Sequence, residues 1–349
     1  MSDRVDSLRR ALKAAAHPLA GCALQALPDK GLAHDHVRLA GSGWLARIPK
    51  QSQMGLAADQ NLAYQRACFE RAAVGGHTPV LLGVLAPSMD LSRGALLVAE
   101  IQGRPASLPR DLTAIVRALA SMHRLPLPPE AQRAPLLNHS DPLGALVAEI
   151  TAQATHLPLA GVDPAVSMVI EEELGRLRRL CAQPPRPQRH LIAFDGHPGN
   201  FIVRPDGSAV LVDLEKCRYS YPGLDLAHAT LYTSTTWDLE SHAVLSEGDV
   251  AAAYATWHRR MGGAAGDAAR WHIPLRKAMW LWSMTWCVKW RVLSRAQTRA
   301  SGDGEDWSAG HSEAGLVAHV RERVDHYLGL TVVMQVLHGF DALEKVMSS

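Results

Sequence analysis

The segment from residue 190 to residue 227 restricts the fold of this chain more than any other part of its sequence. Residues 201–204 and 209–212 are apolar and typical of strands, and the Pro-Asp-Gly sequence between them is a strong turn signal. The segment therefore predicts a β-hairpin. A hairpin brings its two ends together, so Asn200, just before the first strand, is expected beside Asp213, just after the second.

Asp195 adds a second carboxylate to this pair. It lies five residues before Asn200, and the glycines and the proline between them indicate a loop. Phosphoryl transfer to an alcohol needs one carboxylate to orient the hydroxyl group and take its proton, and a second to hold magnesium against the ATP phosphates. An amide oxygen completes the metal shell without excess negative charge. Protein kinases use an Asp, an Asn five residues later and the Asp of a DFG motif, and the order here agrees, with Asp213-Leu214-Glu215 in the DFG place.

Three motifs follow one another along this segment and together resemble those of a known family. They are Asp-Gly-His-Pro-Gly-Asn at 195–200, Val-Asp-Leu-Glu at 212–215 and Gly-Leu-Asp-Leu-Ala at 223–227. The family they resemble is that of aminoglycoside phosphotransferases and choline kinases, which reads His-Gly-Asp-x-His-x-x-Asn, then Ile-Asp-(Phe/Trp)-Glu, then Asp-Leu-Ala. The likeness covers roughly residues 25–300 and is strongest over 190–230.

The resemblance implies an enzyme that uses ATP and Mg²⁺ to transfer the γ-phosphoryl group to a hydroxyl group of a small molecule. By this resemblance Asp195 is the catalytic base, and Asn200 and Asp213 are the metal ligands. Asp225 is expected to support the site without contacting the metal. His197 and Glu215 are further candidates for contacts to the substrate or to the groups around it.

Ala193 departs from the family pattern, because it stands where the family has its first histidine. That histidine usually supports the loop rather than touching substrate, so we interpret its loss as a change of scaffolding. The alternative is a catalytically weak pseudokinase or a nucleotide-binding scaffold of the same fold. The intact Asp195, Asn200 and Asp213 favour the enzyme.

The elements expected elsewhere place the hairpin in the larger of two lobes. Before residue 103 we expect an amphipathic helix over 1–25, strands over 36–50, 79–85 and 95–100, and a helix over 57–74. Beyond it the helical pattern dominates. The sequence thus predicts an α+β, bilobal protein-kinase-like fold. Residues 1–103 would form a small β-rich nucleotide-binding lobe with one main helix, and residues 104–349 a large, mostly helical lobe with the catalytic hairpin and the acceptor site.

Candidate nucleotide contacts lie in the N-terminal lobe. Ser42 and Gly43 belong to a Gly-Ser-Gly turn, and glycine lets backbone amides approach phosphate oxygens. We therefore expect this turn over the phosphates. Arg47 on the following strand, or Lys50 just beyond it, would supply the cation that meets them.

A partner for that cation is expected on the helix over 57–74. Gln65 occupies the position expected for its glutamate, and Glu70 is the only carboxylate beyond the first turns, so the partner stays open. The stretch with Glu100 and Ile101 resembles the interlobe hinge, whose backbone would bind the adenine edge.

Two other nucleotide-binding motifs are not supported. Gly-Ser-Gly-Trp-Leu-Ala formally matches a dinucleotide-binding fingerprint, but a strand follows it where that fingerprint requires a helix. No P-loop motif occurs in the sequence.

The acceptor side of the site carries a weaker signal. Trp282 and Trp286 lie one helical turn apart and could form an aromatic wall for a cationic or flat acceptor. Choline-, thiamine-, sugar- and aminoglycoside-like alcohols all fit, and nothing in the sequence fixes the oligomeric state.

Composition narrows the range of partners and compartments. The balance of 36 basic and 34 acidic residues gives no electrostatic case for nucleic acid or an anionic membrane. Five scattered cysteines without a CxxC pair indicate reduced thiols, and the charged N-terminal stretch does not resemble a signal peptide. We therefore expect a cytoplasmic protein.

Overall fold

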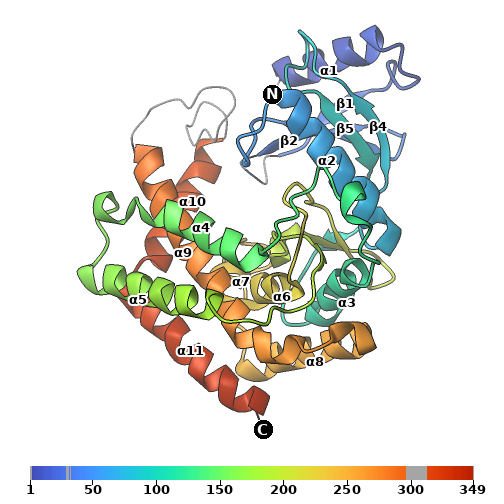
Figure 1. Cartoon of the computed structure of the whole chain (residues 1–349). Helices are drawn as coiled ribbons and strands as arrows, with labels where there is room; N and C mark the ends of the chain where they lie inside the picture. Colours follow the sequence, from blue (N-terminus) through green and yellow to red (C-terminus); the bar gives the residue numbers. More distant parts are fainter. Residues whose placement is uncertain (1, 29–30, 32, 296–312, 349) are drawn as a thin grey trace.

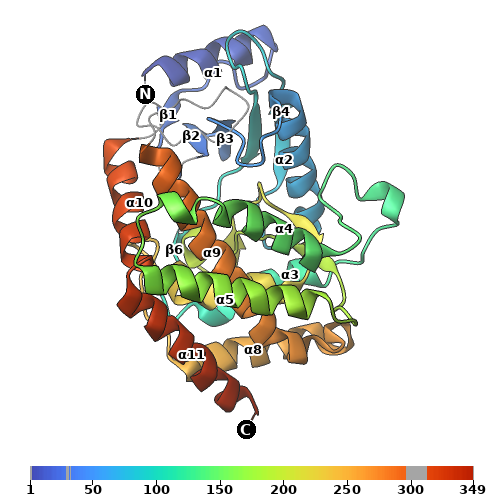
Figure 2. The same cartoon turned by 60° about the vertical axis from the view of Figure 1, so that its left-hand side comes forward.

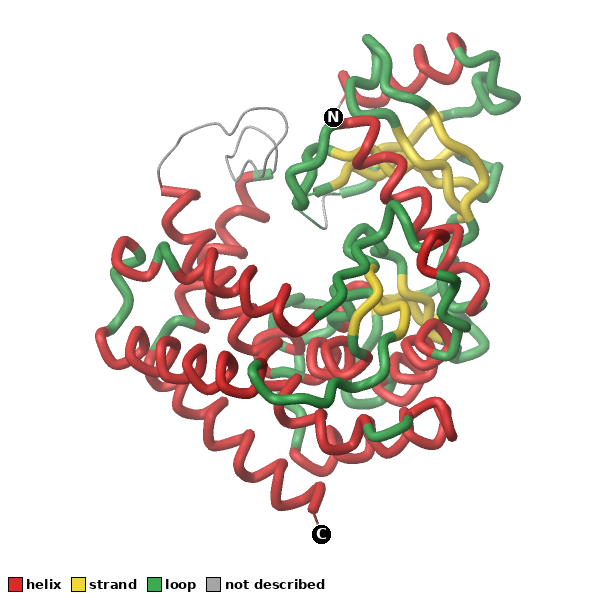
Figure 3. Tube along the Cα trace, in the orientation of Figure 1, coloured by secondary structure: helices red, strands yellow, loops and turns green. Residues whose placement is uncertain are grey.

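The computed structural model describes residues 2–28, 31, 33–295 and 313–348, and the chain divides into a sheet-rich N-terminal part and a larger helical part (Figure 1). The longer strands gather in the N-terminal part, whereas only short strands interrupt the helical part (Figure 3). None of the described helices has the length and apolar character needed to cross a membrane. The five cysteines are free thiols.

A five-stranded antiparallel sheet forms the N-terminal part, in the spatial order β1-β2-β3-β5-β4. Its strands are β1 (Leu24–Ala26), β2 (His34–Leu39), β3 (Trp44–Pro49), β4 (Leu81–Leu85) and β5 (Ala95–Ala99). Helix α2 (Ala58–Ala72) packs with Leu96 and Val98, whereas α1 (Ser2–Ala14) packs with Leu97. Successive residues of a strand face opposite sides of a sheet, so the two helices cover opposite faces of β5 (Figure 2).

The first helix is shorter than the sequence predicts, and the expectation of one helix over residues 1–25 is wrong. Helix α1 ends at Ala14, Ala16 adopts a left-handed conformation with a φ of 48°, and the His17 N–H group donates to the Leu12 carbonyl. This hydrogen-bond pattern closes a helix, and Pro18 directly after it cannot continue one. The chain then turns back into β1.

The helical part is built around α9 (His272–Arg295), whose apolar side chains enter the largest buried cluster. Helix α6 (Pro222–Thr230) is buried along its whole length and packs against α9. The other helices are α3 (Leu112–His123), α4 (Pro142–Ala154), α5 (Pro164–Cys181), α7 (Tyr232–Thr235), α8 (Glu247–Met261), α10 (Ala314–Tyr327) and α11 (Leu330–Ser348). Because α6 is enclosed on all sides, its side chains can hold neighbouring loops in fixed positions.

The predicted hairpin is present and lies within the helical part. Its strands, β8 (Phe201–Val203) and β9 (Ala209–Leu211), pair antiparallel along their whole length. The Asn200 carbonyl accepts a hydrogen bond of 2.9 Å from the Val212 N–H group. Asn200 and Asp213 therefore lie side by side, as the sequence predicts.

Short strands connect the hairpin to its surroundings. β6 (Arg104–Pro105) pairs with β8, and β7 (His190–Ile192) pairs with β10 (Arg218–Ser220). Gly103 approaches β8 so closely that a Cβ there would lie 2.4 Å from the Val203 carbonyl oxygen, so only glycine fits. The division of the chain into 1–103 and 104–349 falls at this crossing and stays a prediction.

Candidate active site

Asp225 holds the loop that carries Asp195. It lies on α6, is fully buried, and its two carboxylate oxygens accept the N–H groups of Ala193 at 2.8 Å and Phe194 at 2.7 Å. Phe194 adopts a left-handed conformation with a φ of 62°, which is uncommon for a bulky residue. The two hydrogen bonds therefore hold a strained backbone position directly before Asp195.

A histidine from another helix supports Asp225. His123, at the end of α3, is fully buried, and its Nε2 lies 2.9 Å from Asp225 Oδ2. Trp257 Nε1 donates to His123 Nδ1 at 2.9 Å, so Nε2 carries the ring proton and donates it to the carboxylate. The loop is thus supported by a histidine outside it, which agrees with our interpretation of Ala193 as a change of scaffolding.

Asp195 faces basic side chains. Its Oδ2 lies 2.7 Å from Lys216 Nζ, and its Oδ1 lies 3.7 Å from His228 Nδ1. Burial alone would raise the pKa of Asp195, but the positive charge of Lys216, together with His197 and His228, lowers it below its usual value. Asp195 is therefore ionised at neutral pH, and its orientation is fixed by Lys216.

Asp213 is paired with a cation from the N-terminal sheet. Arg47, which is 3 % exposed, donates from Nη2 to Asp213 Oδ1 at 2.7 Å and from Nη1 to the Val212 carbonyl at 2.9 Å. Lys50 lies 3.7 Å from Asp35. Of the two predicted cations, Arg47 therefore reaches the end of the hairpin.

Asn200 connects the predicted metal ligands to the loop. Its Nδ2 donates to the Asp195 carbonyl at 2.9 Å, which leaves the side-chain oxygen of Asn200 to bind a cation. The amide is thereby oriented by the residue that the sequence predicts as the base.

His34 and Glu215 form a buried group with Asp213. One ligand atom from each of the three lies within 4.8 Å of the others. Burial and the negative charge of Asp213 raise the pKa of Glu215 to about 8, and burial together with Arg47 lowers the pKa of His34 to about 3. Both His34 and Glu215 are therefore uncharged at neutral pH.

Gln65 joins this uncharged pair. Its side-chain oxygen lies 3.0 Å from His34 Nε2, and its Nε2 lies 3.5 Å from Glu215 Oε2. Glu70, the other candidate partner for the cation, pairs instead with Arg66 at 2.7 Å. Asp213 thus takes the place of the glutamate that the sequence pattern led us to expect beside Arg47.

The Gly-Ser-Gly turn lies at the end of the sheet away from Asp213. The Gly43 carbonyl accepts the Glu100 N–H group at 2.8 Å, so the turn borders the predicted hinge. Arg47 is four residues further along β3, a separation of roughly 13 Å at about 3.3 Å per residue. The predicted placement of Ser42 and Gly43 over the phosphates is not supported by this position. The connection from β1 to His34 lies at the Arg47 end, although residues 29, 30 and 32 within it fall outside the described residues.

Glu100 and Ile101 directly follow β5. The Glu100 N–H group is taken by Gly43, and its carboxylate accepts from Arg38 Nε at 2.6 Å. Within the described part of the chain, no residue hydrogen-bonds to the backbone of Ile101. Of the two predicted hinge residues, Ile101 therefore has backbone groups available for a ligand.

Trp282 lies against the loop that carries Asp195. Its ring meets Phe194 edge-on at 5.2 Å between centroids, its centroid is 5.8 Å from Lys216 Nζ, and its Nε1 donates to Glu149 Oε1 at 2.7 Å. Trp286, one turn later, packs against Trp237 at 5.8 Å. Only Trp282 of the predicted pair thus contacts the residues around Asp195.

His197 and four residues that the sequence analysis missed, His34, His123, Lys216 and His228, complete the site. The His197 ring lies 5.8 Å from that of His228, and its Nδ1 is buried with no hydrogen-bond partner among the described residues. Lys216 was missed although it directly follows the Val-Asp-Leu-Glu motif, where its charge was a usable signal. His123 and His34 come from distant segments, so no local spacing could have indicated them.

Comparisons with known proteins agree with this geometry. A sequence model of the phosphotransferase enzyme family matches residues 26–262. A choline/ethanolamine kinase family protein from Mesorhizobium loti has a similar structure, with a TM-score of 0.58, 18 % identity, and coverage of 97 % of this chain and 99 % of that one. Choline kinase from Cryptosporidium parvum gives a TM-score of 0.56 at 12 % identity, with 93 % and 94 % coverage. An aminoglycoside phosphotransferase with ADP bound gives 0.52 at 11 % identity, with 91 % and 96 % coverage. No curated protein matches the sequence at a significant level.

The match to the family model extends over more than half of the chain, so this chain belongs to the phosphotransferase enzyme family. It is a small-molecule kinase with the α+β, protein-kinase-like fold of the aminoglycoside phosphotransferases and choline kinases. The predicted family and fold class are thereby confirmed.

Proposed function

We propose that this protein transfers the γ-phosphoryl group of magnesium-bound ATP to a hydroxyl group of a small molecule. One observation carries the proposal: Asp195, Asn200 and Asp213 converge at one end of the hairpin. Lys216 adds a buried cation to the same group. These are a base, two metal ligands and a positive charge, which are the parts that phosphoryl transfer to an alcohol requires.

The side chains around Asp213 suit the groups proposed. Asp213 and Asn200 offer carboxylate and amide oxygens, the donors that Mg²⁺ prefers. Arg47 now neutralises Asp213 from 2.7 Å, so the site already accommodates positive charge there. With a metal ion held by Asp213 and Asn200, the Arg47 guanidinium would be available to the phosphates. Ile101 would meet the adenine edge through its backbone.

Each residue of the group has a separate task. Magnesium-ATP, when bound, supplies the phosphoryl group, and its Mg²⁺ ion offsets the negative charge of the phosphates. Asp195 accepts the proton of the acceptor hydroxyl as the oxygen forms its bond to phosphorus and the bond to the ADP oxygen breaks. Lys216 orients Asp195 and places its charge where negative charge accumulates. Asp225 keeps the backbone before Asp195 in its strained conformation.

The acceptor would lie against Trp282, on the Asp195 side of the site. Trp282 is fixed by Glu149 and Phe194 and is 8 % exposed, so the exposed part of its ring would offer a small rigid surface to a ring or to a hydroxylated amine. Choline, ethanolamine and aminoglycosides appear in the names of the similar structures and are the first acceptors to examine.

A screen of acceptors tests this function. ADP release is measured with magnesium-ATP and one alcohol at a time: choline, ethanolamine, thiamine, hexoses and aminoglycosides. We expect one class to raise ADP release well above the rate in water, with loss of that gain in Asp195→Asn. A gain that survives in Asp195→Asn would contradict the assignment of the base.

A further inference from the structure

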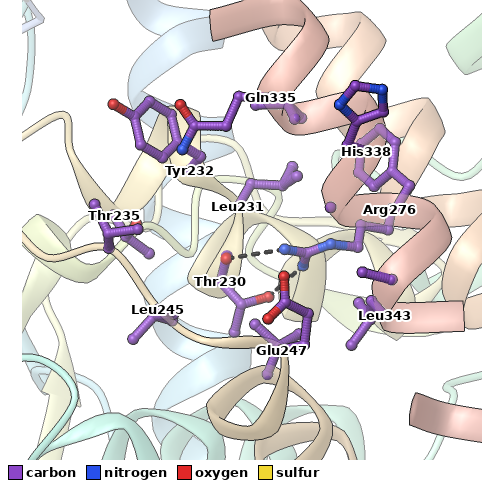
Figure 4. Close-up of a pocket in the computed structure, with 16 residues that line it drawn as sticks. Thr230, Leu231, Tyr232, Thr235, Leu245, Glu247, Arg276, Gln335, His338 and Leu343 are labelled. Atoms are coloured by element: carbon purple, nitrogen blue, oxygen red, sulfur yellow. Dashed lines mark hydrogen bonds between the residues drawn. The ribbon is translucent and has the colours of Figure 1, made fainter. Parts of the chain in front are cut away.

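A second pocket lies at the C-terminal end of α6. It has a volume of about 320 Å³, and its walls come from the ends of α6 and α7, from α8 and α9, and from α11. This volume reaches the lower end of the range of small-molecule sites, which begins at about 300 Å³. Figure 4 shows Arg276 of α9 reaching across the pocket to Thr230 at the end of α6.

Arg276 is a buried cation without an ionic partner. It is 7 % exposed, and it donates to the Thr230 hydroxyl at 2.6 Å and to the Thr230 carbonyl at 3.0 Å. In the part of the chain that the structure describes, no carboxylate lies within ion-pair distance of its guanidinium. The carbonyl end of α6 offsets part of this charge. A buried charge is otherwise costly unless an anion or further hydrogen bonds satisfy it.

Thr235 also lines the pocket, but Figure 4 shows it on the opposite side from Arg276. Its hydroxyl oxygen is buried, so a bound molecule would not reach it. Arg276 is therefore the group that would hold an anion in this pocket.

The remaining walls are mostly apolar. Apolar side chains from four segments line the pocket: Leu231, Leu245, Val250, Val336, Phe340 and Leu343. Glu247 is exposed at the edge and forms no ion pair with Arg276, and its negative charge disfavours ligands with several negative charges. From these contacts we infer that the pocket binds a small organic carboxylate with an apolar body, its carboxylate on Arg276.

This site is separate from the acceptor site. Different residues of α6 serve the two sites: Asp225 and His228 contact the Asp195 loop, whereas Thr230 at the end of the helix holds Arg276. The inference therefore does not depend on the proposed function, and a protein without kinase activity could still bind the carboxylate.

Calorimetry on the full chain tests the inference with 3-phenylpropionate and its uncharged amide. We expect one molecule of the acid to bind per chain and the amide to bind at least about tenfold more weakly, because the amide lacks the charge that pairs with Arg276. Arg276→Lys, which keeps the charge, should weaken binding of the acid several-fold. Arg276→Gln should abolish it.

Two controls make the outcome specific. Arg291→Gln changes another α9 arginine, one that pairs with Asp325 at 2.7 Å outside the pocket, and it should bind the acid as the wild type does. Asp195→Asn should also bind it unchanged. Equal affinity for acid and amide, binding of inorganic phosphate in place of the acid, or unchanged binding in Arg276→Gln would overturn the inference. So would the absence of any binding of the acid at millimolar concentration.

Discussion

Lys216 Nζ lies 2.7 Å from Asp195 Oδ2, and the two side chains are only 13 % and 16 % exposed. The ammonium group keeps the proposed base charged, and it does so from a position beside the predicted metal ligands. Burial would lower the pKa of Lys216, but the negative charge of Asp195 raises it, so the lysine stays protonated. The ion pair is therefore a permanent part of the site rather than a pH-dependent one.

Replacement of Lys216 by methionine should reduce turnover by about 10²-fold, in the range of a positioned catalytic group. The side chain keeps its length, but Asp195 loses its orientation and the site loses a positive charge. Magnesium-ATP binding should change little, because Lys216 contacts Asp195 rather than Asp213. Steady-state kinetics with the acceptor from the screen, together with calorimetry of nucleotide binding, checks both. Lys216→Arg, which keeps the charge, should recover part of the loss; equal loss in both variants would contradict this account.

Asp225→Ala should destabilise the protein strongly, because two buried N–H groups lose their acceptor. The expected cost is about 1–3 kcal/mol for each unsatisfied group, read as a lower free energy of unfolding in urea. Asp206→Ala is the matched control, since Asp206 accepts from Ser208 in an exposed turn. It should change the free energy of unfolding by about 0.5 kcal/mol or less. Equal stability of the two variants would show that Asp225 does not hold the loop.

Glu215→Gln should make the protein more stable, and increasingly so as the pH rises. The folded protein keeps the Glu215 proton up to a pKa of about 8, whereas the unfolded chain loses it near 4.5. Between these values the folded state binds the extra proton, so wild-type stability falls as the pH rises, by up to about 1.4 kcal/mol per pH unit. Glutamine removes this dependence. Urea unfolding at pH 5, 7 and 8.5 checks it, and a stability difference that shrinks with pH would refute the assignment.

Trp282→Leu should raise the KM for the acceptor about tenfold and leave the KM for ATP unchanged. The ring contacts Phe194 and lies beside Lys216, whereas nothing links it to the nucleotide contacts around Arg47. A loss of this size corresponds to one aromatic contact. Trp286→Leu, one turn away and packed on Trp237, is the control. If both variants raise the acceptor KM equally, the acceptor does not rest on Trp282 alone.

The sequence was most informative where the chemistry depends on neighbours along the chain. The Pro-Asp-Gly turn between two apolar runs sufficed to place Asn200 beside Asp213, because a hairpin has one arrangement of its ends. The change of pattern near Gly103 likewise predicted a sheet-rich part followed by a helical part.

Contacts between distant segments could not be predicted in this way. His123 reaches Asp225 across 102 residues, and His34, at the start of β2, approaches Glu215, which follows the hairpin. The position of the Gly-Ser-Gly turn depends on such contacts too. Its composition suits phosphate binding, but the pairing of the strands places it beside Glu100. The sequence predicted a first helix longer than α1 because the apolar spacing continues beyond the point where α1 ends, just before Pro18.

Calorimetry of ATP binding with and without Mg²⁺ tests the central claim most directly, because it requires no knowledge of the acceptor. The wild type and Asp195→Asn should both bind ATP more tightly when Mg²⁺ is present, since Asp195 is not a proposed metal ligand. Asp213→Asn should lose most of that gain, and Asn200→Ala should lose part of it, because each removes a ligand. A gain from Mg²⁺ that is unchanged in Asp213→Asn would contradict the account.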